Sequence, residues 1–125
     1  MTKKNHKYVS IDASVLGINK AIPVLESNRN QLKAMGIQLT LGKLDDDTIE
    51  SYEEQLKLYS EVIEGEVAFL RDVLKLTDKQ VEAVYDLDQD ETIALIMQVI
   101  GRLNHVDDSV YEEAAEKVAS AQEAE

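Results

Sequence analysis

Three alternating aspartates, Asp86, Asp88 and Asp90, have the spacing in this sequence that most resembles a metal site. An EF-hand loop binds calcium through oxygen ligands at positions 1, 3 and 5, and it also needs a glycine at position 6 and a bidentate glutamate at position 12. Here position 6 is Glu91 and position 12 is Met97, which cannot chelate a cation. Helix capping explains the same aspartates with less strain, because acidic side chains are favoured at a helix N-terminus. We therefore predict no calcium site.

His105, which is followed by Asp107 and Asp108, is the other candidate metal ligand. No second histidine is near it and the chain has no cysteine, so a histidine that meets the negative end of a helix dipole is the commoner case. We also find no Ser–His–Asp order, glycine-rich phosphate loop or paired-carboxylate motif, and five glycines are few for a cofactor cradle. We predict that the protein is not an enzyme and has no catalytic residue, cofactor or metal.

Composition narrows the class of protein. The chain has 125 residues, 44% of them hydrophobic and 30% charged, which suits a single domain over residues 1–125, and we expect residues 1–6 and 120–125 to be flexible. Asp and Glu number 25 against 13 Lys and Arg, which gives a net charge of −12 and argues against binding to nucleic acid phosphates. No apolar run approaches the ~18 residues of a membrane span, so we predict no membrane partner.

Four capping boxes predict where helices begin. In a capping box the first side chain accepts a hydrogen bond from the backbone N–H three residues on, and the acid or amide there reaches back to the first residue's N–H. The boxes are Asp47-x-x-Glu50, Thr77-x-x-Gln80, Asp88-x-x-Glu91 and Ser109-x-x-Glu112. They predict helices over about residues 47–74, 78–85, 89–103 and 109–119.

The helix predicted over residues 47–74 has an apolar stripe along one face. The stripe consists of Ile49, Tyr52, Leu56, Tyr59, Ile63, Val67, Leu70 and Leu74. Further apolar residues widen it between Val62 and Leu74 to an arc of roughly 160°. An arc of this breadth needs two packing neighbours, or one neighbour and an outside partner.

Glu66 is the one charged residue inside that arc. An unpaired buried charge is costly, so Glu66 should have a basic neighbour or lie at the exposed rim of the face. The alternative is that it is a polar anchor in a protein interface. The candidate partner-binding residues are therefore Val62, Glu66, Phe69, Leu70 and Val73. The competing interpretation is that this face is buried within the domain.

The remaining segments complete the predicted fold, which is mainly α, a small helical domain with a long central helix. The helix over residues 89–103 is apolar over roughly 200° of its circumference, so we expect Ile93, Ile96, Ile100 and Leu103 in the core. For the N-terminal third, the pattern predicts short strands at residues 8–11 and 37–41 and a helix over residues 24–35 that Pro23 starts and Gly36 ends. These strands would form a short β-hairpin resting on the helices; an all-helical fold with irregular N-terminal loops is the alternative.

Three segments are similar to a known family. They are FLRDVLKLTDKQ at residues 69–80, VYDLDQDETI at residues 84–93 and Arg102-Leu103, and together they resemble the tail assembly chaperones of long-tailed, siphovirus-type phages of Gram-positive bacteria. The resemblance covers residues 66–108 and consists of helix ends, caps and core positions.

The resemblance implies a non-catalytic protein of the host cell cytoplasm that is absent from the mature virion. Such chaperones bind the tape measure protein, keep it soluble and help to recruit tail tube subunits, and in many members a frameshift yields a second, longer product. Self-association of the chain is a further expectation. Two other functions stay open: an acidic nucleic-acid mimic and a structural tail completion protein.

Overall fold

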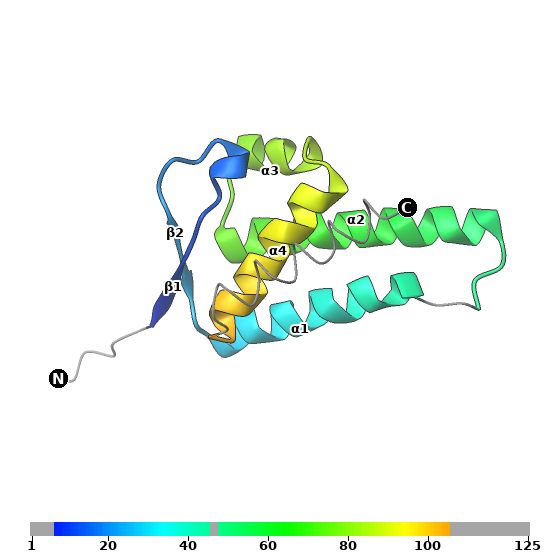
Figure 1. The fold of residues 1–125 in the computed structure, drawn as a ribbon, viewed down its shortest axis with the longest axis horizontal. Coiled ribbons are helices and arrows are strands. Elements are labelled where there is room, and N and C mark those ends of the chain that lie inside the picture. The colour runs from blue at the N-terminus through cyan, green and yellow to red at the C-terminus, as the bar shows by residue number, and fades with distance from the viewer. Residues whose placement is uncertain (1–6, 46–47, 106–125) are drawn as a thin grey trace, which may run out of the picture.

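A two-stranded antiparallel sheet begins the part of the chain that the computed structural model describes, which comprises residues 7–45 and 48–105. Strand β1 (Tyr8–Ile11) pairs with β2 (Ile22–Leu25), so that Ile11 lies opposite Ile22 (Figure 1). The predicted hairpin is confirmed, but its second strand is not at residues 37–41. Pro23 lies inside β2 and does not start a helix. The strand tolerates a proline because each strand of a two-stranded sheet has a free edge, where the missing N–H breaks no hydrogen bond between strands.

Helix α1 (Asn28–Gly42) replaces the predicted strand at residues 37–41. The Ser27 side chain accepts a hydrogen bond from the N–H of Asn30 at 3.1 Å and thereby starts the helix four residues later than predicted. Gly36 does not end it, because a glycine inside a helix costs only about 1 kcal/mol. Ile37 is buried and Leu39 is 75% exposed, although a strand would turn both to the same face. The alternation of apolar and polar residues that predicted a strand is therefore part of a helix.

Helix α2 (Tyr52–Leu74) is the long helix, and it begins later than the predicted Asp47. Ser51 caps it by accepting a hydrogen bond from the N–H of Glu54 at 3.3 Å, which leaves Ile49 in the preceding segment. Asp47 lies outside the described residues. The helix ends where Lys75 adopts a left-handed conformation with φ 53°, from which its N–H reaches the carbonyl of Arg71.

Helices α3 (Asp78–Tyr85) and α4 (Gln89–Leu103) have the predicted bounds. Both capping boxes are formed in full, by Thr77 with Gln80 and by Asp88 with Glu91. Of the core positions expected on α4, Ile96, Ile100 and Leu103 are buried and Ile93 is half-buried. The helix predicted over residues 109–119 lies outside the described residues.

The helices are arranged around one apolar core, to which the strands and all four described helices contribute. Helices α1 and α2 form a long antiparallel pair, and α4 crosses them close to the strands (Figure 1). Beyond α4 the pair continues as a projecting arm (Figure 1). We define the arm as residues 38–45 and 48–63.

Replacement of Thr77 by Ala is expected to destabilise the domain by about 1 kcal/mol, because the change removes the side-chain half of the α3 capping box and no buried atoms. Urea unfolding followed by circular dichroism measures the loss. Ser60→Ala, an exposed hydroxyl removed from the interior of α2, is the control and should change the free energy of unfolding by less than about 0.5 kcal/mol. Equal values for the two variants would show that this cap contributes nothing.

Candidate functional site

The three alternating aspartates lie at helix ends. Asp86 follows the last residue of α3, Asp88 accepts a hydrogen bond from the N–H of Glu91 at 2.7 Å, and Asp90 lies in the first turn of α4. Their predicted role in capping is confirmed for Asp88. Among residues 7–45 and 48–105, no group of three or more His, Asp and Glu side chains is placed to hold a metal ion.

His105 lies at the C-terminal end of α4, as the sequence predicted. It has a left-handed backbone with φ 57°, and its N–H donates to the carbonyl of Arg102 at 3.2 Å. Its ring Nε2 contacts the carboxylate of Glu26, between β2 and α1. The sequence pattern did not reveal Glu26, which is distant along the chain. Asp107 and Asp108 lie outside the described residues.

The five candidate partner-binding residues all lie on the second half of α2, and all five are buried. Their exposed fractions are 1% for Val62, 1% for Glu66, 5% for Phe69, 0% for Leu70 and 2% for Val73. Phe69 lines the contact between α2 and α1 together with Ile37, and Leu70 and Val73 belong to the main core. In this structure the four apolar members are packed inside the domain, and contact of any of the five with a partner stays a prediction.

Glu66 is the exceptional member of that group because it is a carboxylate in an apolar surrounding. Its Oε2 accepts a hydrogen bond from Nε2 of Gln89 at 3.2 Å, at the start of α4, whereas its Oε1 is buried without a hydrogen-bond partner. Burial raises the pKa of Glu66, and the bond from Gln89 opposes this only in part. Of the alternatives given for Glu66, the position at the rim is wrong because the residue is 1% exposed, and the side chain that bonds to it is the neutral Gln89 and not a basic one.

The first half of the α2 stripe is exposed. Tyr52 is 75% exposed, Leu56 52%, Tyr59 57% and Ile63 44%. We call these four residues the open seam. They continue the buried part of the stripe, Val67, Leu70 and Leu74, because successive members are three or four residues apart and lie on one face of the helix.

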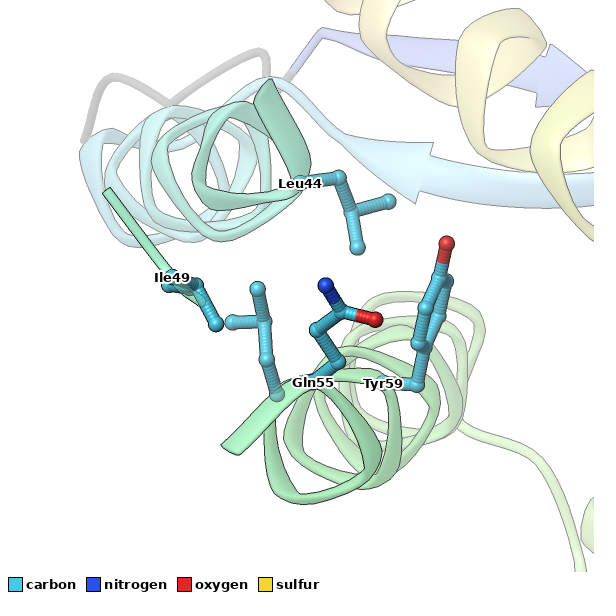
Figure 2. A pocket seen from close by; sticks show the side chains of 5 residues that line it. Leu44, Ile49, Gln55 and Tyr59 are labelled. Carbon is cyan, nitrogen blue, oxygen red and sulfur yellow. The ribbon is translucent and has the colours of Figure 1, made fainter. Parts of the chain in front are cut away.

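A hollow of about 160 Å³ lies beside the open seam, at the tip of the arm. Its lining consists of Leu44, Ile49, Gln55, Leu58 and Tyr59. Figure 2 shows Leu44 and Ile49 on one side of it, facing Gln55 and Tyr59 of α2. Leu44, Ile49 and Leu58 give the hollow apolar walls, and Gln55 and Tyr59 add polar atoms to its lining.

The sequence contains one signal for the open seam. The second column of apolar residues beside the stripe, which includes Phe69 and Val73, is dense only in the second half of α2. A helix has more packing neighbours where its apolar face is wide than where it is narrow. This signal therefore indicates that the first half of α2, with the narrow face, has fewer neighbours. Which part would be left uncovered nevertheless depends on where α4 crosses.

Comparison with known proteins identifies the family. Residues 2–122 match the family described as phage tail assembly chaperone proteins, TAC, and the chain therefore belongs to this family. No curated protein and no solved structure matches the chain. In the described part of the chain, none of the helices combines the length and the apolar character that crossing a membrane requires.

Proposed function

We propose that this phage tail assembly chaperone binds the tape measure protein, keeps it soluble and helps to recruit tail tube subunits around it. The proposal extends to the class of phage, a siphovirus-type phage of Gram-positive bacteria. The protein acts in the host cell cytoplasm during tail assembly, performs no catalysis and does not remain in the finished particle.

The single observation that carries the proposal is the open seam on the arm. A tape measure protein is a long helical molecule, and an amphipathic helix binds where another protein offers apolar side chains at helical spacing. Tyr52, Leu56, Tyr59 and Ile63 offer this over three turns of α2. The net charge of −12 supports solubility of the complex, because like-charged particles repel one another.

Binding at the open seam is compatible with the buried face having a structural role. The prediction from sequence located the partner at Val62, Glu66, Phe69, Leu70 and Val73, which would require α2 to separate from its neighbours. The open seam requires no such opening. We therefore propose the open seam as the first contact.

Co-expression with the tape measure protein of the same phage tests the function. We expect that most of the tape measure protein is soluble and co-purifies when the chain is present, and that it aggregates when the chain is absent. If the chain does not increase the soluble amount, the chaperone function proposed here is wrong.

A matched pair of variants tests the surface in the same assay. Leu56→Asp places a charge in the open seam and is expected to reduce co-purification by about tenfold or more, since a buried charge at a contact is costly. Val15→Asp changes a comparably exposed apolar residue near the strands, 43% exposed, and should have no effect. Circular dichroism checks that both variants are folded. Equal co-purification with both would exclude the open seam.

A further inference from the structure

The acidic charge of the arm is concentrated on α2. Residues 38–45, the other side of the arm, carry one cation, Lys43, and one acid, Asp45. The first half of α2, residues 52–64, has four acids and one base. That base, Lys57, lies 3.7 Å from a carboxylate oxygen of Glu53, so it neutralises part of this charge only.

Two of the four acids border the open seam. With about 100° of rotation per residue, Glu53 and Glu64 lie roughly 100° from the centre of the seam, on the side away from α1. Glu64 is held there by the hydroxyl of Tyr85, which donates to its Oε2 at 2.9 Å. The other two acids, Glu54 and Glu61, point toward the opposite side of the helix. The apolar surface therefore has an edge on which the acids Glu53 and Glu64 outnumber the one base, Lys57, and we call it the acidic edge.

The tip hollow adds a site for one large side chain. Its volume is about 160 Å³, and Tyr59 belongs both to the hollow and to the open seam. A helix lying along the seam would therefore have an apolar side chain within reach of the hollow. Such anchors in pockets carry a large share of binding energy at protein interfaces.

We propose that the open seam binds an amphipathic helix that has lysine or arginine along one edge of its apolar face and inserts one large apolar side chain into the tip hollow. The inference rests on the proposed function and deepens it, because it specifies which segments of the tape measure protein are bound. The observations that favour this occupant are the acidic edge, the continuity of the seam with the surface that the domain already covers, and the hollow.

Binding of designed peptides to the full chain tests the inference. The probe is a fluorescently labelled synthetic helix with leucines at positions i, i+3, i+4 and i+7 and lysines elsewhere, and fluorescence anisotropy measures its affinity. The two comparison peptides have glutamate in place of lysine, or the same composition in scrambled order. We expect the lysine helix to bind at least about tenfold more tightly than either, with an affinity that falls as salt is added.

Variants separate recognition at the seam from general attraction to an acidic protein. Leu56→Asp makes the surface more acidic, and yet it should weaken binding of the lysine helix by about tenfold. The double variant Glu53→Gln/Glu64→Gln should weaken binding more than Glu54→Gln/Glu61→Gln, which removes the same charge from the opposite side of the helix. Equal binding by both double variants, or undiminished binding by Leu56→Asp, would overturn the inference.

Light scattering distinguishes a partner helix from a second copy of the chain. If the wild type dimerises and Leu56→Asp restores the monomer, the seam is an interface between copies and the inference is wrong. The proposed function has a separate outcome. Rescue of the tape measure protein without peptide binding would refute this inference and leave the function standing, and peptide binding without rescue would refute the function.

Discussion

Phe69→Asp is expected to unfold the domain, with a loss of more than about 4 kcal/mol in the free energy of unfolding. Removing a buried aromatic ring costs about 3–5 kcal/mol, and the new carboxylate would be buried between α2 and α1, where Phe69 is 5% exposed. The cost of the lost ring and the cost of the buried carboxylate add, and their sum reaches the lower part of the range of small-domain stabilities, which is about 5–15 kcal/mol, so we expect the variant to unfold. Circular dichroism and urea unfolding measure the effect.

Phe69→Leu is the matched control, because it keeps the site apolar and should retain the fold. Leu56→Asp introduces the same charge into the same helix at a residue that is 52% exposed, and it should leave the free energy of unfolding within about 1 kcal/mol of wild type. The contrast between the two Asp variants separates core from contact surface on one helix. A folded Phe69→Asp monomer that no longer binds the tape measure protein would instead favour the partner-binding face predicted from sequence.

Helices α3 and α4 could be predicted to the residue because their ends are encoded locally. Thr77 with Gln80 and Asp88 with Glu91 each form a complete capping box within four residues, so no distant contact is needed to place the start. The predicted start of α2 at about Asp47 is wrong, because here the local signal is ambiguous. Asp47 and Ser51 both precede an apolar stripe, and Ser51 is the residue that caps the helix.

The N-terminal third could be predicted only in part because its pattern fits two periods. Ile37, Leu39 and Leu41 alternate as in a strand, yet Ile37 and Leu41 are also one helical turn apart. Packing decides between the two: Ile37 is buried in the core and Leu39 is 75% exposed. The register of β1 with β2 likewise depends on pairing across a connection of ten residues, 12–21, which no local signal specifies.

The candidate site shows the same division between local and distant information. The sequence predicts the whole apolar stripe of α2, from Tyr52 to Leu74, because its spacing is a property of one helix. The width of the apolar face is its only signal for which half is covered, and the packing itself is distant information: α4 is shorter than α2 and crosses it near the strands (Figure 1). The second half of α2, where the apolar arc is wide, therefore lies in the core, and the first half, where the arc is narrow, is exposed.

Glu66→Met is expected to stabilise the folded protein by about 1–3 kcal/mol at neutral pH, because it removes a buried carboxylate of which one oxygen has no hydrogen-bond donor. Gln89, which loses its acceptor, is exposed and can turn to water. Thermal or urea unfolding measures the gain. Glu61→Gln, an exposed acid on the same helix, controls for the lower net charge and should give a much smaller effect.

The pH dependence identifies the cause of this gain. Burial raises the pKa of Glu66 in the folded state, so the folded protein binds this proton more tightly than the unfolded chain does. Below the unfolded pKa of about 4.3 the group is neutral in both states and its ionisation costs no stability. As pH rises from there through the raised folded pKa, the unfolded state gains more free energy from ionisation than the folded state does, and wild type loses stability relative to Glu66→Met.

The stability advantage of Glu66→Met over wild type should therefore be largest at neutral pH and shrink toward pH 4. Glu66→Gln, which keeps an oxygen acceptor for Gln89, should follow the same pH profile. An advantage independent of pH would show that packing, not the buried charge, limits stability at this position.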